Sequence, residues 1–340
     1  MKFLFAPTAC FAFTLIATAQ NNPSVNQATT AEQRRQADQM LRDLAPSDEV
    51  PALYSDEEAD VGPQSVLRKR KPTWFRASLD SQAYYTDNMQ FQPHHEQGAG
   101  VAITSLEAAL NTPPCITRFA SYHAEVGYRH QFFNYFGHDN IAARLDAEDF
   151  DFDSSTAFGD VVAQTKHYQF RAGFDYTRLL GFEPLYRHDY DEFYTEYVPR
   201  WSVQRNFRVC DSSMFSVAYL GSYHFTDENA PVVFKPASVI LGKIASDRNE
   251  RWEHTFLAAY TMALPHHVVA QPFYRYQFTD FVNGNDNVRL HTVGLGVGWI
   301  PCENFSVRGF IGYNWQKSDN RAVQYEQLNA GGGVNVTLRF

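Results

Sequence analysis

Long runs with a two-residue period fill the sequence from Thr73 to Phe340. In residues 121–132, apolar and aromatic side chains occupy most of one set of alternate positions, and charged, polar or glycine residues occupy the other. Residues 167–177 show the same alternation, and the runs at 215–225 and 307–315 repeat it. Successive side chains of a β-strand point to opposite faces of its sheet. Each run therefore predicts a strand with one apolar and one polar face.

The length of these runs and the position of their rings indicate a membrane. The runs are about 10–14 residues long, whereas strands of soluble proteins average about 5–6 residues and membrane-spanning strands need about 9–11. Aromatic residues gather at the two ends of the apolar faces, as at Tyr122 and Phe132 or at Tyr313 and Trp315. Aromatic girdles at two membrane interfaces give this arrangement. The pattern predicts strands that cross a lipid bilayer.

Short and long connections alternate between the runs, and the long ones are polar. Transmembrane β-barrels alternate short turns with longer loops, and their strand number is even. We therefore predict an all-β fold, a transmembrane antiparallel up-and-down barrel of twelve strands over residues 73–340. The weakly patterned residues 150–163 are included because the alternation requires a strand there. The expected strands are 73–86, 98–111, 118–134, 150–163, 167–179, 191–206, 213–226, 251–264, 267–281, 288–300, 303–317 and 326–340.

The first 19 residues have the features of an export signal. Lys2 supplies a positive charge, residues 3–16 form an apolar stretch, and residues 17–19 read Ala-Thr-Ala. A charged start, an apolar stretch and a small-residue cleavage site define a signal peptide. We predict a signal peptide over residues 1–19, with a buried hydrophobic N-terminal helix as the alternative.

Residues 20–72 differ in composition from the barrel region. Thr29 and Glu32 have the spacing of a capping box ahead of one short helix, and an acidic run at 56–60 and a basic run at 68–71 follow. We expect a periplasmic N-terminal segment that serves as a tethered, partly disordered leader. The alternative is a helix that contacts a partner or plugs the barrel.

Composition and cysteine placement exclude several classes of protein. The 29 Lys and Arg residues face 38 Asp and Glu residues, and this net charge of −9 disfavours nucleic-acid binding, which needs a basic surface. The mean hydropathy of −0.40 is too low for a bundle of membrane helices. Outside the signal, Cys115, Cys210 and Cys302 all fall in expected short turns. Turns spread around a barrel rim are too far apart for a disulfide, so we expect free thiols or an intermolecular link.

The last strand carries a resemblance to a known family. The chain ends on Phe340, and Val334, Val336 and Leu338 lie behind it on the same face. This resembles the C-terminal signature of bacterial outer-membrane β-barrel proteins, porin-like chains whose terminal Phe and alternating apolar residues are read by the assembly machinery. Together with the export signal, the resemblance implies an outer-membrane location in a Gram-negative-type envelope. Membrane lipids and the barrel assembly machinery are its implied partners.

The polar faces of the strands are expected to line the barrel interior. They carry arginines and carboxylates but no lysine: Arg76, Asp80, Glu107, Glu125, Arg129, Arg171, Asp175, Glu196, Arg200, Glu253, Arg275 and Arg308. A charged lining is costly in a dry core and natural in contact with water. Two interpretations stay open: a polar channel that these groups narrow, and a lumen closed by a salt-bridged network.

The sequence offers no motif for catalysis. Nucleotide-binding, zinc-protease and nucleophile-elbow motifs are absent, so we expect no catalytic residue, no metal site and no cofactor, and we do not expect an enzyme. An outer-membrane lipid hydrolase would need a Ser, a His and a polar orienting group together on the lipid side. Since His130 is taken as the one lipid-facing histidine well inside a strand, no such trio is predicted.

These patterns favour a passive channel for small polar solutes, with loops 227–249 and 318–325 shaping its mouth. The alternative is a non-conducting structural or adhesion barrel whose loops bind external partners. No nucleic-acid partner is expected.

Overall fold

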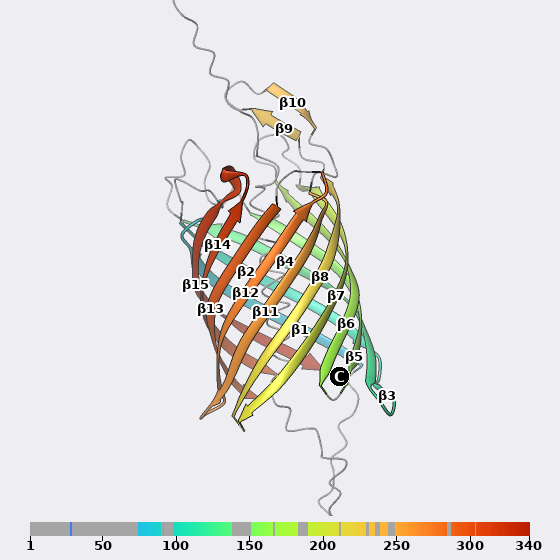
Figure 1. Ribbon diagram of the computed structural model, residues 1–340. Coiled ribbons are helices and arrows are strands. Elements are labelled where there is room, and N and C mark those ends of the chain that lie inside the picture. Colours follow the sequence, from blue (N-terminus) through green and yellow to red (C-terminus); the bar gives the residue numbers. More distant parts are fainter. Residues whose placement is uncertain are drawn as a thin grey trace, which may run out of the picture.

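In the computed structural model, twelve antiparallel strands form a closed barrel (Figure 1). The structure describes residues 28, 74–89, 91, 98–137, 151–165, 167–182, 190–210, 212–228, 231–234, 239–243, 249–283, 287–302 and 304–340. The barrel strands are β1 (Phe75–Thr86), β2 (Ala99–Asn111), β4 (Ser121–Phe136), β5 (Phe152–Gln164), β6 (Tyr168–Phe182), β7 (Tyr190–Cys210), β8 (Ser213–Glu228), β11 (Arg251–Leu264), β12 (Val268–Phe281), β13 (Asn287–Cys302), β14 (Phe305–Ser318) and β15 (Tyr325–Arg339).

The barrel closes between its first and last strands. β1 pairs with β2 on one side and with β15 on the other, so every barrel strand has two hydrogen-bonded neighbours. At the seam, the Phe340 amide donates to the Phe75 carbonyl and the Trp74 amide donates to the Phe340 carbonyl, both at 2.9 Å. The predicted fold class is confirmed, and the weakly patterned fourth strand exists as β5.

The observed strand bounds differ from the expected ones mainly at the strand ends. β7 was expected to end at residue 206 but continues to Cys210, because Phe207 and Arg208 still pair with Phe215 and Met214 of β8. With so short a turn between the two strands, pairing continues to the rim of the barrel.

The two ends of the barrel differ in the length of their connections (Figure 1). At one end, tight turns join successive strands, and the two-residue strand β3 (Cys115–Ile116) lies between β2 and β4. The opposite end carries the long connections, including the hairpin of β9 (Pro231–Phe234) and β10 (Val239–Lys243) and the 3-10 helix η2 (Arg321–Val323). We call these the short-turn end and the long-loop end. In membrane barrels, short turns face the periplasm.

Cys115, Cys210 and Cys302 all lie at the short-turn end. Each is an exposed free thiol, and no disulfide joins the three. The expectation of free thiols is confirmed for the single chain, and an intermolecular link stays a prediction.

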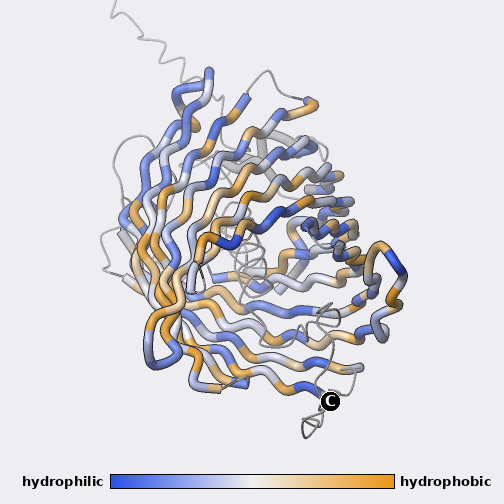
Figure 2. Tube along the Cα trace, turned by 60° about the horizontal axis from the view of Figure 1, so that its bottom comes forward, coloured by the Kyte–Doolittle hydropathy of each residue, from blue (hydrophilic) through white to orange (hydrophobic). Residues whose placement is uncertain are grey.

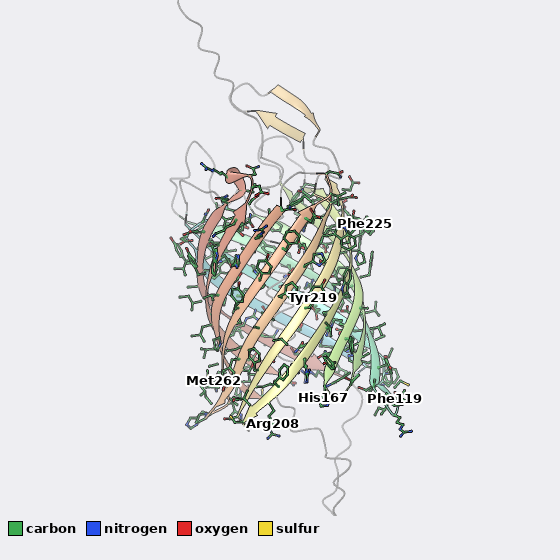
Figure 3. All side chains as sticks on the ribbon, viewed as in Figure 1. Phe119, His167, Arg208, Tyr219, Phe225 and Met262 are labelled. Carbon is green, nitrogen blue, oxygen red and sulfur yellow. The ribbon has the colours of Figure 1, made fainter. Side chains whose placement is uncertain are left out.

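Each barrel strand has one face outside and one face inside the barrel. Apolar and polar residues alternate along the chain (Figure 2). The middle of the outer surface is exposed and apolar, with aliphatic residues such as Leu79, Leu106, Leu295 and Ile311 and with the rings of Phe174 and Phe256. In Figure 3, Phe119 lies at the short-turn end, Tyr219 about half-way along the barrel and Phe225 toward the long-loop end.

Exposed rings also lie toward both edges of this apolar band. Near the short-turn end they are Trp74, Phe75, Tyr122, Tyr168, Phe207 and Phe340, and near the long-loop end they are Tyr85, Phe136, Tyr190, Phe225 and Trp252. An apolar band with rings toward both of its edges is the exterior of a barrel that stands in a bilayer.

Of the first 73 residues the structure describes only Ala28, which is helical. The expected signal peptide at 1–19 and the expected short helix that follows Thr29 lie outside the described residues. Among the described residues, none belongs to a helix that is long and apolar enough to cross a membrane.

Candidate functional site: the barrel interior

The charged residues assigned to the interior from the sequence lie on the inward positions of their strands. They are Arg76, Asp80, Glu107, Glu125, Arg129, Arg171, Asp175, Glu196, Arg200, Glu253, Arg275 and Arg308. Most of them form ion pairs with neighbouring strands, and these pairs fall into four groups around the wall.

The first group joins β1, β2 and β4. The Arg76 guanidinium lies 2.7 Å from the Glu107 carboxylate and also pairs with Glu125. Arg129 lies 3.5 Å from Glu107, with its side chain 1% exposed and its guanidinium 5.8 Å from the centre of the Phe158 ring. Two arginines and two carboxylates thus compensate one another on this part of the wall.

The second group joins β5, β6 and β7. Arg200 donates from Nε to Asp175 at 2.8 Å and from Nη2 to Asp175 at 3.0 Å and to Asp160 at 2.9 Å. Arg171 lies 3.4 Å from Asp160. The forked contact of Arg200 with Asp175 is a geometry that lysine cannot reproduce.

Replacement of Arg200 tests this second group. We expect Arg200→Ala to lower the free energy of unfolding by about 1–3 kcal/mol, because two nearly buried carboxylates lose their closest donor. Urea titration in detergent micelles, followed by tryptophan fluorescence, measures the change. Arg171→Ala is the matched control, since it removes one contact at 3.4 Å and should cost less. Equal unfolding midpoints for wild type and Arg200→Ala would contradict the assignment.

The third group joins β7, β8 and β11 in the half toward the long-loop end. Arg251 Nε lies 2.7 Å from Glu253. The two ring nitrogens of His224 lie 3.1 Å from Glu196 and 3.7 Å from Glu253. Tyr194 donates to Glu196 at 3.0 Å. The histidine therefore bridges two carboxylates on the inner wall.

The fourth group crosses the seam between the first and last strands. Arg308 of β14 donates to Asp80 of β1 at 2.7 Å, and Asn335 of β15 donates to the same carboxylate at 3.2 Å. This group ties three strands together where the barrel closes.

Asp160, Arg251 and His224 are among the charged or titratable inward residues that the sequence-based list leaves out. Asp160 lies on β5, whose pattern was too weak to read face by face, and Arg251 is the first residue of β11. His224 alternates correctly with exterior Tyr223 and Phe225, so its position was readable. Asp160 and Arg251 add one carboxylate and one arginine to the six carboxylates and six arginines expected from the sequence.

A chain of neutral polar contacts covers the inner wall of β12 to β15. Arg275 donates to Thr292 at 3.0 Å, Thr292 to Asn314 at 2.7 Å, and Asn314 to Gln327 at 3.0 Å. Gln327 in turn donates to the Asn88 carbonyl at 2.9 Å. The segment that follows β1 is therefore anchored inside the barrel.

Several polar atoms on the inner wall have no protein partner. Within the described part of the chain, Ser216 Oγ, Gln277 Oε1 and Thr86 Oγ1 are buried and make no hydrogen bond to the protein. Buried polar groups are normally satisfied by protein or by water. A bound water molecule at these positions would complete their hydrogen bonding.

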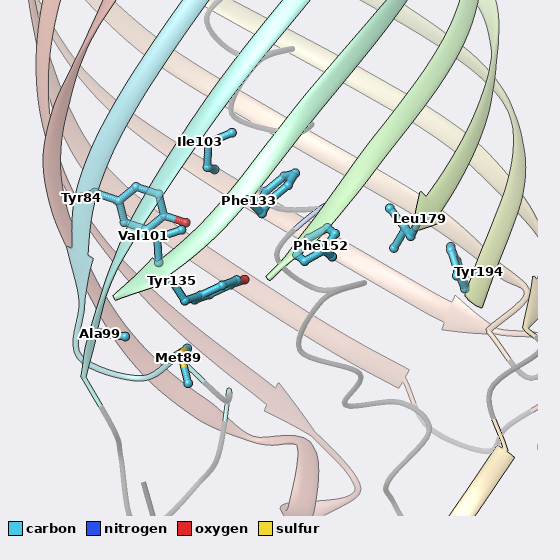
Figure 4. Packing of buried hydrophobic residues seen from close by; sticks show 10 residues of the cluster. All are labelled: Tyr84, Met89, Ala99, Val101, Ile103, Phe133, Tyr135, Phe152, Leu179 and Tyr194. Carbon is cyan, nitrogen blue, oxygen red and sulfur yellow. The ribbon is translucent and has the colours of Figure 1, made fainter. Parts of the chain in front are cut away.

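An apolar cluster lies inside the barrel at the long-loop end (Figure 4). Its members come from the long-loop ends of β1, β2, β4, β5, β6 and β7 and from the segment after β1: Tyr84, Met89, Ala99, Val101, Ile103, Phe133, Tyr135, Phe152, Leu179 and Tyr194. Ala28 packs against this cluster. Close by, Phe91 packs edge-on against Tyr325, with ring centres 5.0 Å apart. Among the described residues, the largest apolar cluster of the interior therefore lies at this end.

The closed barrel, its apolar outer band and its polar interior define the class of this protein. It is an outer-membrane β-barrel, since closed antiparallel barrels with an apolar outer band and an even number of strands are the spanning structures of that membrane. Its C-terminal side chains Val334, Val336, Leu338 and Phe340 lie exposed on the outer face of β15. Their role as an assembly signal stays a prediction.

Comparisons with known proteins agree with a barrel architecture and go no further. The sequence matches no family model and no curated protein. The translocator domain of the autotransporter NalP from Neisseria meningitidis is similar, with a TM-score of 0.49, 11% identity, and 94% of this chain and 99% of that chain covered. An outer-membrane channel from Pseudomonas putida F1 has a TM-score of 0.49, 8% identity and coverage of 82% and 100%. A KdgM porin in complex with disordered oligogalacturonate has a TM-score of 0.37, 10% identity and coverage of 76% and 98%.

The outer surface corrects one expectation about histidines. His130 is not the one lipid-facing histidine inside a strand, because the faces of β11 and β13 also turn His254 and His291 outward. Tyr219 and Tyr274 lie within hydrogen-bond distance of these two rings, each at 2.8 Å.

The expectation that no Ser, His and polar orienting residue meet on the outer surface is also wrong. His130 lies between Ser155 and Asp153. Neither residue was singled out because both lie on the weakly patterned β5.

Proposed function

We propose that this outer-membrane barrel is a passive channel for small polar solutes. The observation that carries the proposal is the inner wall, where ion pairs, amides and hydroxyls extend from the short-turn end to the apolar cluster. Ion pairs and unpaired polar atoms are costly in a dry core, so such a wall is suited to a water-filled interior. The salt-bridged groups lie along the wall between neighbouring strands, which is compatible with space at the centre.

The charge balance of the wall bears on which solutes pass. Each of the four groups contains at least one arginine and one carboxylate, and several of the pairs lie within 3 Å. Compensated charges leave little net field along the path, so we infer weak preference between anions and cations. The apolar cluster and the inward-turned Met89 and Phe91 restrict the path at the long-loop end, which favours small solutes. Residues 229–230, 235–238 and 244–248 of loop 227–249 lie outside the described residues, and the role of this loop at the mouth stays a prediction.

Current through single molecules in planar bilayers tests the channel. We expect discrete conductance steps and a reversal potential near zero under a salt gradient. Arg308→Gln should shift the reversal potential toward cation preference, because it leaves the Asp80 carboxylate without its guanidinium partner. The matched control is Arg289→Gln, which removes an arginine from the outer face of β13 and should leave the reversal potential unchanged. No current above background at any voltage would refute the channel and favour the non-conducting structural or adhesion barrel.

A further inference from the structure

A serine, a histidine and an aspartate meet on the outer surface of the barrel. His130 of β4 stands directly opposite Ser155 of β5 in the strand pairing, and Asp153 lies two residues along the same face of β5. The Nδ1 atom of His130 lies 2.8 Å from Ser155 Oγ, and its Nε2 atom lies 3.6 Å from Asp153 Oδ2. The imidazole therefore bridges a hydroxyl and a carboxylate.

Further polar groups surround these three side chains. Tyr128 donates to Ser155 Oγ at 3.1 Å, and Tyr190 donates to Asp153. On the other side of Ser155, the paired residue of β6 is Arg178, whose half-exposed side chain pairs with Glu192. A donor hydroxyl and a guanidinium thus flank the serine.

We propose that this cluster is a hydrolytic site for the acyl esters of membrane lipids. Ser155 is the nucleophile, His130 the general base and Asp153 the positioning residue that orients the imidazole. Tyr128 is the donor for the oxyanion, since its hydroxyl already lies beside Ser155 Oγ. With the Ser155 hydroxyl donating to Nδ1, the Nε2 proton points toward Asp153.

The reaction balances with the ester and water alone. Ser155 Oγ attacks the ester carbonyl and gives its proton to His130, and the carbon–oxygen bond to the leaving alcohol breaks as His130 returns that proton to the alcohol. Water, deprotonated by His130, then attacks the acyl-serine and releases a carboxylic acid while Ser155 regains a proton. The products are one alcohol and one acid.

The position of the cluster on the barrel fits this substrate. Asp153 and Ser155 are the second and fourth residues of β5, counted from the long-loop end. At about 3.3 Å per residue they lie within roughly 10 Å of that end of the strand. Lipid esters lie at the boundary between headgroups and acyl chains, and farther along the same face Ala157 and exposed Val161 offer an apolar surface for an acyl chain.

Acid release from labelled lipids tests the proposal on the full-length mature protein, folded in mixed micelles. Two substrates distinguish the source of the ester: a glycerophospholipid with labelled acyl chains and a lipid A preparation with labelled ester-linked chains. We expect release from at least one, and a loss of about 10²–10⁴-fold in Ser155→Ala and in His130→Asn. Asp153→Asn should lower the rate and shift its pH profile, which a merely structural residue would not do. His254→Asn is the matched control, since His254 is an outward histidine beside a tyrosine rather than a serine, and it should release acid like the wild type.

The result has two outcomes. Acid release that depends on Ser155 and His130 but not on His254 supports the site, and a fluorophosphonate probe should then label Ser155. Equal acid release from wild type and Ser155→Ala, or no acid release from either lipid, overturns the hydrolytic site. The three side chains would then be only a polar contact on the outer surface. Conductance of Ser155→Ala should equal that of the wild type in both cases, so failure of this site and failure of the channel are distinguishable.

Discussion

Removal of residues 20–72 is expected to raise the single-channel conductance by about twofold or more, because a lumen of twelve strands is narrower than that of a 16-stranded porin and any chain inside it excludes solute. Ala28 packs against the apolar cluster at the long-loop end, inside the barrel. Trp74, which precedes β1, lies at the short-turn end and bonds to Phe340. Ala28 and Trp74 therefore lie at opposite ends of the barrel, and the obstruction of the lumen by residues 20–72 is the prediction under test. Conductance of the mature and truncated proteins in planar bilayers, at the same salt concentration, measures the difference.

A point variant separates this effect from a general loss of the segment. Ala28→Asp places a carboxylate against the apolar cluster, which weakens the packing without shortening the chain. We expect its conductance to lie between those of the mature and truncated proteins. Equal conductance in all three would show that the segment leaves the solute path unobstructed.

The strands of the barrel could be predicted because the order of apolar and polar residues in each strand reflects which side chains face lipid and which face the interior. A residue on the outer face meets hydrocarbon and its neighbour meets the interior, so the two-residue period is strong wherever both contacts hold. β4 shows this clearly, with Val126 outside between Glu125 and Gly127 inside. The assignment of twelve charged residues to the inner wall followed from the same period.

The alternation of apolar and polar residues is lost where the inner face carries apolar residues or the outer face carries polar ones. On β2 the inward residues Val101 and Ile103 are apolar because they belong to the apolar cluster, so both faces look alike there. On β5 the outward residues Asp153 and Ser155 are polar, which blurs the contrast with inward Ser154 and Thr156. Both departures mark the places where the structure has features beyond a plain barrel.

The side chains that lie opposite each other on neighbouring strands could not be predicted from the sequence. The trio on the outer surface depends on the register that sets His130 opposite Ser155, and a shift of one residue would turn one of these side chains inward. The sharing of Asp160 between Arg171 and Arg200 likewise depends on the register of three strands. Periodicity gives the face of a residue, and only the pairing gives its neighbours.

An arginine in the middle of the outer surface is expected to be among the most destabilising single substitutions of the barrel. Leu295 is 40% exposed and lies half-way along β13, between Pro272 of β12 and Ile311 of β14. If this surface contacts hydrocarbon, Leu295→Arg lowers the free energy of unfolding by about 2–4 kcal/mol, the cost of an arginine at the bilayer midplane. Guanidinium titration of the protein in lipid vesicles, followed by tryptophan fluorescence, measures it.

The control is an arginine on the same outer surface near the rim. Val282 is 51% exposed and follows the last residue of β12 at the long-loop end. Val282→Arg should cost about 0–1 kcal/mol, since the penalty falls toward the membrane interface. Because both substitutions add the same charge to an exposed aliphatic position, depth in the membrane is the main difference between them. Equal costs for the two would mean that the middle of the barrel does not contact hydrocarbon, which would remove the basis for a lumen as well as for a lipid-facing hydrolytic site.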